Sequence, residues 1–381
     1  MNIFKKKSCG DCNYLIFILA FNLTLINAKI NDPKIHQFDT FIQSSIKKSN
    51  IAGLGISILC KDSILYKKGY GYEDIQKKEK FTTNTIMNIA SISKTFVGVS
   101  IMYLVEQQKI NLDDDVNTIL PFTVNNPYEK NPITLRSLMS HASGIIDNQN
   151  IYLKSYHYGY DSPIALEKFL QNYLSSNGNY FSKTNFNSKQ PGEEFNYSNI
   201  GTGLAGLIVE IIAKKPLNIF SKEIIFTPLG MNDTYWFFSE MDTSKHSKLY
   251  KFNSKDNKLD LIELYGLTTY PDGGLRTTVN DLTKYFYYCI NYKNHEVTIL
   301  KEESLEEIFK TDFFDYYSKF WNIGNMIGHG GGDPGVTTGM FYNKKQDIGY
   351  IFLINTSDFI KEENFEQTII DFGLHLKNIR P

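Results

Sequence analysis

Residues that favour β-strands gather near both ends of this sequence, and helical patterns fill its middle. The β-rich runs are 53–60, 63–70, 320–329, 336–342 and 348–355. The first two are joined at Lys61-Asp62, which is the pattern of a β-hairpin. We expect an α/β (α+β) fold in which both chain ends build one antiparallel sheet, with a mainly helical region inserted between them.

Four stretches have the spacing of apolar residues that is typical of amphipathic or buried helices. They are 35–46, 91–107, 199–213 and 364–376. Residues 176–196 are polar and irregular and are expected to form a surface loop. We therefore predict one catalytic domain over 29–381, with an α/β region of about 29–90 and 320–381 and a helical region of about 91–319.

The composition excludes several classes of protein. The 381 residues include 40 Lys and Arg against 41 Asp and Glu, so the chain has no bulk positive charge with which to hold nucleic acid. Four cysteines are too few for a disulfide scaffold. A hydrophobic content of 42% and a charged content of 21% are typical of a folded chain. The length allows one large domain or two ordinary ones.

The first 28 residues have the pattern of a secretory signal peptide. Lys5, Lys6 and Lys7 precede an apolar run over 14–26 that is short for a membrane span, and Ala28 suits a cleavage site. We expect a secreted or periplasmic protein. The alternative is an uncleaved leader, which would be the route to membrane association.

Cys9 and Cys12 lie inside the leader and are read as incidental rather than as a redox or zinc motif. Cleavage would leave Cys60 and Cys289, which could pair in an oxidising compartment. The sequence alone does not bring these two residues together.

Ser91 and Lys94 form the first candidate for chemistry, an S-x-x-K at the start of an apolar helix. Side chains at positions i and i+3 of a helix lie on one face, about 5–6 Å apart at Cβ. A serine hydroxyl needs a base to become a nucleophile, and a lysine with a lowered pKa can serve as that base. Two further S-x-x-K matches at 44–47 and 45–48 lie on a polar helix face and are taken as chance.

Tyr197, Ser198 and Asn199 form the second candidate, directly before the helix expected over 199–213. A tyrosine hydroxyl can relay a proton, and an asparagine amide can bind a substrate carbonyl. The competing interpretation is an ordinary helix cap by Ser198 or Asn199.

His329 and the three glycines after it form the third candidate, at the end of a β-rich run. Glycines allow a substrate to approach the strand closely, and the histidine could orient a carboxylate or assist proton movement. A lone histidine in a strand is more often structural.

Taken in order, these motifs resemble the serine β-lactamase and penicillin-binding-protein superfamily, in its class C β-lactamase-like and DD-peptidase/esterase branch. The resemblance covers most of 33–378. Six segments carry it: NIASISKTFVGVSIMYLVEQQKINLDDDV (88–116), ITLRSLMSHASGI (133–145), PGEEFNYSNIGTGLAGLIVEII (191–212), FTPLGMNDTYW (226–236), GGLRTTVNDLTKY (273–285) and GHGGGDPG (328–335).

The resemblance implies Ser91 as the acylated nucleophile, Lys94 as its activating partner and Tyr197 as a general base or acid. It also implies a substrate-binding strand and a cofactor-free hydrolase of small-molecule or peptide substrates. It implies three substrate-binding positions, which are Asn199, His329 and Gly331. It implies an oxyanion hole formed by the backbone N–H groups of Ser91 and Gly332. The resemblance does not decide whether Lys94 or Tyr197 is the first base. It also leaves the oligomeric state open.

The third motif departs from the β-lactamase pattern. Dedicated β-lactamases carry Lys-Thr-Gly where this chain has His329-Gly330-Gly331. Because histidine has a reference pKa of about 6.5, it is mostly neutral at pH 7, and Gly330 removes a hydroxyl. We therefore favour a peptide, amide or ester substrate, as in D-alanyl-D-alanine carboxypeptidases and esterases. The alternatives are a β-lactamase and a catalytically silent penicillin- or peptide-binding protein.

Two further features are interpreted structurally. His141, in the SHASG segment, is expected to pack or to form hydrogen bonds. Asp113, Asp114 and Asp115 are expected to form a solvated turn, and no His/Asp/Glu spacing indicates a metal site.

Overall fold

The computed structural model describes residues 32–128, 130–291 and 297–380. The leader with Cys9 and Cys12 lies outside these residues, so the signal peptide stays a prediction. The chain divides into two compact units, Met1–Ser45 and Ile46–Pro381. Helix α2 (Pro33–Lys48) forms where the apolar spacing predicts it. The sheet, the helices around it and the candidate site belong to the second unit.

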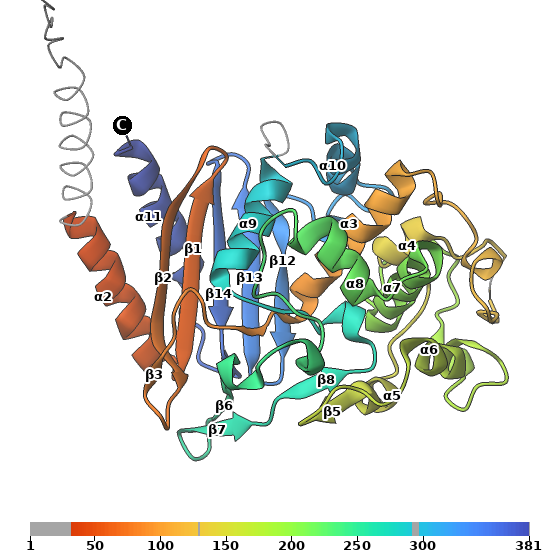
Figure 1. Ribbon diagram of the computed structural model, residues 1–381, viewed down its shortest axis with the longest axis horizontal. Helices are drawn as coiled ribbons and strands as arrows, with labels where there is room; N and C mark the ends of the chain where they lie inside the picture. The colour runs from red at the N-terminus through yellow and green to blue at the C-terminus, as the bar shows by residue number, and fades with distance from the viewer. Residues whose placement is uncertain (1–31, 129, 292–296, 381) are drawn as a thin grey trace, which may run out of the picture. The chain divides into compact units, whose positions relative to one another are not determined.

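One antiparallel sheet of eight strands dominates the second unit (Figure 1). Strand β14 lies between β13 and β1, so the C-terminal strands pair directly with the N-terminal hairpin, as expected. The strands, in sheet order, are β10 (Tyr317–Ser318), β11 (Trp321–Asn322), β12 (Met326–Asp333), β13 (Val336–Asn343), β14 (Ile348–Ile354), β1 (Gly53–Cys60), β2 (Ser63–Asp74) and β3 (Glu79–Lys80).

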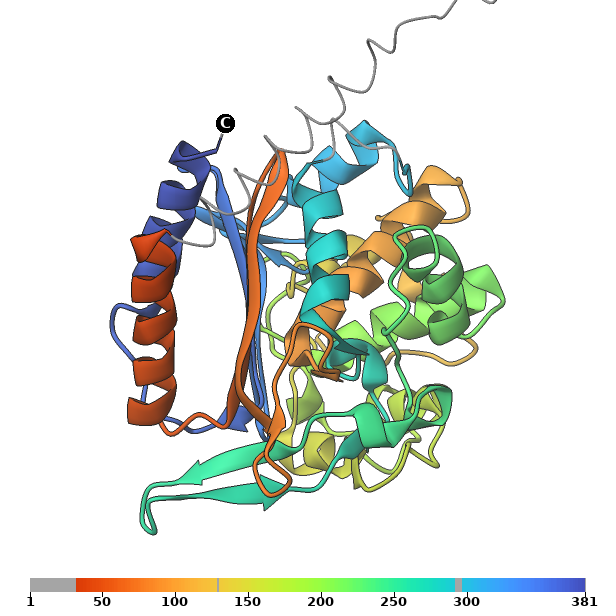
Figure 2. The same ribbon diagram turned by 60° about the vertical axis from the view of Figure 1, so that its left-hand side comes forward.

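Helices cover both faces of this sheet. Figure 2 shows α11 (Phe365–Asn378) on one face and α9 (Val279–Ile290) on the other. Every residue of β1 and β14 is therefore buried, which explains their nearly continuous apolar sequences. Gly373 lets α11 approach the sheet, because a Cβ there would stand 2.9 Å from the side chains of Ile58 and Ile348.

The helical region is built around α7 (Asn199–Ala213), which has the bounds that the sequence predicts. Its residues from Ile200 to Val209 are all buried, because other helices surround it. The other helices of this region are α3 (Ser93–Glu106), α4 (Leu135–Met139), α5 (Gln149–Tyr152), α6 (Leu166–Leu174), α8 (Leu217–Ser221) and α10 (Glu302–Phe309). Packing of α3 against α7 brings the first two sequence motifs to one place.

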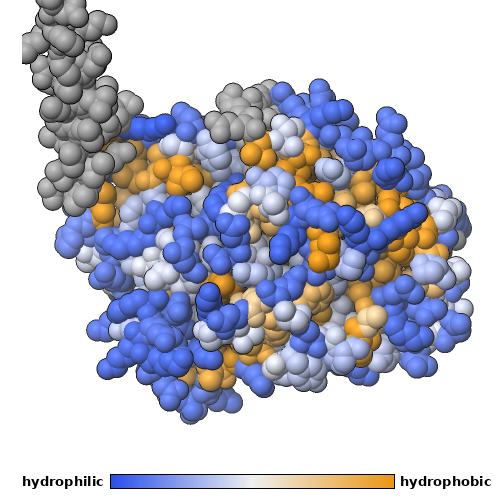
Figure 3. Space-filling model, viewed as in Figure 1, coloured by the Kyte–Doolittle hydropathy of each residue, from blue (hydrophilic) through white to orange (hydrophobic). Residues whose placement is uncertain are grey.

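Three small sheets lie outside the large one. The sequence analysis did not predict them, because their strands are short. They are β15 (Thr356–Ser357) with β6 (Leu249–Asn253) and β7 (Lys258–Ile262), β4 (Met87–Asn88) with β9 (Arg276–Thr277), and β5 (Tyr156–Tyr158) with β8 (Tyr265–Leu267). Hydrophilic side chains gather over the β6–β7 hairpin in the face that Figure 3 shows.

Two predicted boundaries are wrong in an informative way. The run at 320–329 is not one strand: β11 ends at Asn322, and β12 begins at Met326 and continues past His329 to Asp333. The helix expected from Ser91 begins as a 3-10 turn, η1 (Ala90–Ile92), before α3. The cause of the second difference lies in the backbone at Ala90, described below.

Candidate active site

Ser91 lies at a sharp turn between strand β4 and helix α3. The residue before it, Ala90, has a φ of 48°, a left-handed conformation that costs an alanine free energy. Ser93 holds this turn: its Oγ donates to the Ala90 carbonyl at 2.6 Å and accepts the Leu275 N–H at 3.1 Å. The turn leaves Ser91 partly exposed, while the residues after it are buried.

Lys94 lies under Ser91 and is fully buried. Its Nζ is 3.0 Å from Ser91 Oγ and donates at 2.6 Å to the backbone carbonyl of Asp272. That carbonyl fixes the amine on the serine side of the helix. An amine at hydrogen-bond distance from a partly exposed hydroxyl is the arrangement that nucleophile activation requires.

Tyr197 lies beside this pair. Lys94 Nζ is 5.0 Å from the centre of the Tyr197 ring, within range of a cation–π contact. Tyr197 as a residue is 39% exposed. Ser91, Lys94 and Tyr197 therefore meet, although their motifs stand at the starts of two different helices.

Ser198 is the N-cap of α7, so the capping interpretation is correct for this residue. Its neighbours Tyr197 and Asn199 do not cap the helix and stay candidates for chemistry. Ser198 Oγ accepts the Gly201 N–H at 2.9 Å. Asn199 is the first residue of the helix and is partly exposed.

Asp147 fixes this motif, and the sequence analysis missed it. One carboxylate oxygen accepts the Ser198 hydroxyl at 2.8 Å and the Ile200 N–H at 3.0 Å, and the other accepts the Asn199 N–H at 2.8 Å. A carboxylate at a helix N-terminus is stabilised by the unpaired N–H groups and the helix dipole. Asp147 lies three residues after the SHASG segment, and nothing in its local sequence indicates a partner some 50 residues away.

His141 is buried against Tyr197, with ring centres 4.2 Å apart. Its Nδ1 accepts the Ser198 N–H at 3.2 Å, and its backbone carbonyl accepts the Asn196 N–H at 2.7 Å. Burial, with a further contribution from Lys94, lowers the pKa of His141 well below its usual value. The expectation that His141 packs and forms hydrogen bonds is therefore met, at a position that contacts Tyr197 directly.

His329 lies within strand β12 and not at its end. Its side chain is 4% exposed, Nε2 is 3.1 Å from the Tyr317 hydroxyl, and Nδ1 is 2.5 Å from the Gly330 carbonyl. Burial, and then the Lys94 charge, lowers its pKa to about 3, so the imidazole is neutral at pH 7. Both ring nitrogens have protein partners, so a substrate contact would require one of these bonds to break.

Gly331 and Gly332 bring strand β12 to the serine turn. A Cβ on Gly331 would stand 2.5 Å from the Ile89 carbonyl, so only glycine fits there. Thr338, opposite it on β13, donates to that same carbonyl at 2.9 Å. A Cβ on Gly332 would meet nothing within 4 Å, so the strand opens to free space one residue further on.

The remaining sequence candidates lie elsewhere. Asp113 forms ion pairs with Arg136, Asp114 accepts the Asn111 N–H, and Asp115 caps a 3-10 turn, so this acidic stretch is a hydrogen-bonded turn. Cys60 and Cys289 are buried free thiols.

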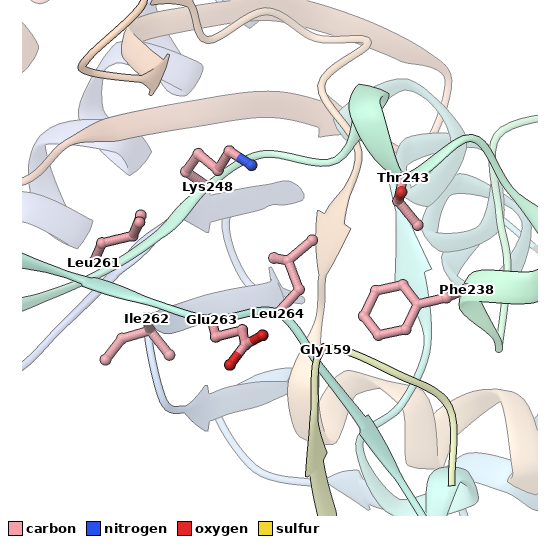
Figure 4. Close-up of a pocket in the computed structure, with 8 residues that line it drawn as sticks. All are labelled: Gly159, Phe238, Thr243, Lys248, Leu261, Ile262, Glu263 and Leu264. Carbon is pink, nitrogen blue, oxygen red and sulfur yellow. The ribbon is translucent and has the colours of Figure 1, made fainter.

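A separate pocket of about 430 Å³ lies beyond the β5–β8 ladder. Figure 4 shows Phe238, Thr243 and Leu264 around its space. None of the site residues named above lines it. Its lining residues are Gly159, Phe238, Thr243, Lys248, Leu261, Ile262, Glu263 and Leu264.

A family profile described as Beta-lactamase matches residues 38–373 of the chain. The chain belongs to the beta-lactamase family. Members of this superfamily are serine hydrolases, and the predicted superfamily and fold class are confirmed. In the described part of this family member, every helix is too short or too polar to span a bilayer.

Among curated proteins, protein flp of Staphylococcus aureus is 26% identical over 337 residues, which cover 86% of this chain. The chain spans 64% of the length of that relative. Among solved structures, the octameric penicillin-binding protein homologue from Pyrococcus abyssi has a TM-score of 0.71 and 26% identity, covering 90% of this chain and 77% of that one. A D-amino acid amidase from Ochrobactrum anthropi, complexed with D-phenylalanine, has a TM-score of 0.72 and 19% identity, covering 92% and 100%.

Proposed function

We propose that this protein is an exported serine hydrolase that cleaves peptide, amide or ester bonds through an acyl-enzyme on Ser91. The observation that carries the proposal is the 3.0 Å contact between Lys94 Nζ and Ser91 Oγ at a strained turn. Tyr197 lies beside this pair and completes the set of groups that acyl transfer needs.

In the proposed reaction, Lys94 in its neutral form takes the Ser91 proton as Oγ attacks the substrate carbonyl carbon. The backbone N–H groups of Ser91 and Gly332 would hold the developing oxyanion, an interaction worth about 3–4 kcal/mol in comparable enzymes. Tyr197 would pass the proton to the leaving amine or alcohol, and the carbonyl–leaving-group bond breaks. Water then attacks the ester carbonyl on Ser91 and gives a proton to the same groups. These groups return the proton to Ser91 Oγ as the bond between Oγ and the acyl carbon breaks, and the acid leaves.

The neutral state of His329 favours such substrates over β-lactam antibiotics. A lysine at this position of the strand would offer a full cation to a substrate carboxylate, whereas His329 is buried and uncharged at pH 7. Of the other cations, Arg276 is buried and donates to the backbone carbonyls of Trp236, Gly274 and Tyr265. Asn199, at the exposed end of α7, would contact the substrate amide. The amidase among the structural neighbours acts, by its name, on D-amino acid amides.

The test is covalent labelling of the purified mature protein with a fluorophosphonate, followed by peptide mapping. We expect the label on Ser91, its loss in Ser91→Ala, and unchanged thermal unfolding of that variant. Folded protein that takes no label and turns over no ester or amide would instead support the silent binding protein. Sustained, rapid nitrocefin hydrolysis would establish a β-lactamase, whereas we expect a slow burst that stops.

A further inference from the structure

Strands β6 and β7 separate directly beyond their last pair, and residues on both sides of the separation line a pocket. The last pair joins the first residue of β6 to the last residue of β7. Beyond it, the Lys248 N–H donates to the Glu73 carbonyl at 2.8 Å, whereas the Leu264 carbonyl accepts the Gly159 N–H at 2.6 Å. The two strands thus leave each other for different partners, and the pocket of about 430 Å³ lies where they part.

One charged side chain stands on each side of this separation. Lys248 directly precedes β6 and Glu263 directly follows β7, so in the register of the ladder they would form the next cross-strand pair. Opposite charges in such positions ordinarily attract each other across the ladder. Here both side chains line the pocket, and neither has an ion pair or a side-chain hydrogen bond with any described residue. The parting of the strands therefore leaves two opposite charges without partners in one cavity.

The carboxylate and the amine are separated by apolar surface. Gly159 has a φ of 88°, and a Cβ on it would stand 2.8 Å from Glu263 Oε1, so the carboxylate lies against bare backbone. In the view of Figure 4, the Leu264 side chain lies between Lys248 and Glu263, and the ring of Phe238 lies across the space from them. A ligand that reaches both charges would therefore pass over apolar side chains.

The apolar wall has one fixed part and one exposed part. Phe238 is 8% exposed, and its ring centre lies 4.0 Å from the guanidinium carbon of the buried Arg276, which holds the ring in place. Leu261, on strand β7, is 62% exposed although it lines the same pocket. Thr243 adds a hydroxyl to the lining. An apolar ligand body would contact the Phe238 ring and remove Leu261 from water.

We propose that this pocket binds a short apolar peptide, about two residues long, whose two ends are free. Its ammonium group would pair with the Glu263 carboxylate and its carboxylate with the Lys248 amine. Two residues span at most about 7 Å, and cross-strand side chains begin about 5 Å apart, so a dipeptide can bridge the parted strands. The volume of about 430 Å³ lies within the range of small-molecule sites, about 300–1,000 Å³.

This inference does not rest on the proposed reaction, because the pocket contains none of the residues proposed for catalysis. The peptide is a zwitterion at pH 7, since the reference pKa values are about 7.7–8.0 for an α-amine and about 3.3–3.7 for an α-carboxyl group. The two ion pairs would be partly exposed to water, so salt should weaken the binding.

The test is isothermal titration calorimetry at pH 7 and low ionic strength, with leucyl-phenylalanine in its L,L and D,D forms. All proteins carry Ser91→Ala, so that the peptide cannot be consumed at the proposed nucleophile. We expect one peptide to bind per chain. The better stereoisomer is then compared with its N-acetylated form, which lacks the ammonium, and with its C-terminal amide, which lacks the carboxylate. Each change should weaken binding by about tenfold or more, as the loss of a charge-assisted hydrogen bond does.

Two variants assign each end of the peptide to its partner. Glu263→Gln keeps the shape of the side chain but removes its charge, so it should bind the free peptide and the N-acetylated form equally. Lys248→Met keeps the apolar stem, so it should bind the free peptide and the amide equally. Such a double-mutant comparison isolates each contact. Lys255→Met is the matched control, because Lys255 is exposed on the β6–β7 turn outside the pocket, and its affinities should stay those of the parent protein.

Thermal unfolding should be the same for all these variants, because neither Lys248 nor Glu263 has a side-chain partner to lose. Equal affinities for the free peptide and both blocked forms would overturn the proposal, as would the absence of saturable binding. An equal loss in Lys255→Met would mean a general effect of charge and would also overturn it. Binding that is unchanged in Lys248→Met and Glu263→Gln would place the peptide elsewhere, with the groove beside residue 91 as the alternative, and would overturn the pocket.

Discussion

His141 binds the backbone on both sides of Tyr197. The His141 carbonyl accepts the Asn196 N–H at 2.7 Å and its Nδ1 accepts the Ser198 N–H at 3.2 Å, while the two rings lie 4.2 Å apart. His141 itself has a φ of 51°, and this left-handed conformation turns both acceptors toward the same segment. Because Nδ1 accepts a hydrogen bond, the imidazole has to be neutral, with its proton on Nε2. His141 thus sets the position of Tyr197.

We predict that His141→Ala lowers the rate of Ser91 acylation by about a hundredfold, as misplacement of a reacting group by about 1 Å does. His141→Asn should recover a large part of this loss. Its Oδ1 stands where Nδ1 stood, and asparagine tolerates a positive φ better than alanine does. Stopped-flow labelling with a fluorophosphonate measures both variants. Similar rates for both variants would contradict the role of Nδ1, and thermal unfolding checks that each is folded.

A second prediction concerns which group takes the first proton. The 3.0 Å contact of Lys94 Nζ with Ser91 Oγ favours the amine. Lys94→Arg keeps a long basic side chain beside Tyr197, but an arginine cannot be deprotonated in a protein and so cannot act as a base. We therefore expect acylation to fall by about 10²–10⁴-fold, the usual contribution of a general base. The measurement is the labelling rate between pH 6 and 10. An arginine variant within a fewfold of the wild type would assign the base to Tyr197, and Tyr197→Phe would then show the larger loss.

A third prediction concerns stability at the start of α7. Asp147 accepts three hydrogen bonds there, from Ser198, Asn199 and Ile200. Asp147→Ala leaves these donors unpaired and removes a negative charge from the positive end of the helix, so it should lower the free energy of unfolding by about 2–3 kcal/mol. Urea denaturation measures the change. Asp256→Ala, on the exposed β6–β7 turn, should cost only a few tenths of a kcal/mol, and an equal loss in both variants would contradict the cap.

The sequence predicted those parts of the molecule that repeat a local pattern. Helix α7 has the predicted bounds, because its apolar residues follow the helical period and a capping serine precedes it. The hairpin of β1 and β2 turns at the predicted Lys61-Asp62. Ser91, Lys94 and Tyr197 could be proposed because each stands in a short motif at the start of a helix.

What the sequence did not predict consists of contacts between distant loops. The 3-10 turn at Ser91 depends on Ser93 meeting Leu275, and the position of Tyr197 depends on His141. The closeness of Asp333 to Gly273 depends on β12 packing beside the turn that precedes β9. The tertiary structure alone brings these residues to their partners. No periodic or compositional pattern in the sequence therefore indicates the contacts.

The last prediction concerns acid stability and His329. In the folded protein burial lowers the pKa of His329 to about 3, whereas an unfolded histidine has a pKa of about 6.5. Between these values the unfolded chain binds a proton that the folded chain does not, so the contribution of His329 to stability is complete above pH 6.5 and is lost as the pH falls. One such proton is worth up to about 1.4 kcal/mol per pH unit. Asp272 and Asp333 have the opposite sign, because their raised pKa values favour the folded state as the pH falls below 7.

His329→Gln isolates the histidine, because both aspartates remain and the longer glutamine amide can reach the position of Nε2 and still pair with the Tyr317 hydroxyl. We expect the wild type to lose more stability than the variant between pH 7 and pH 5, by about 2 kcal/mol, since the unfolded histidine gains most of its proton in that range. Urea denaturation at pH 7, 6 and 5 gives the two slopes. Parallel slopes would mean that His329 titrates normally in the folded protein, and a charged imidazole beside Lys94 would then be available to bind a substrate carboxylate.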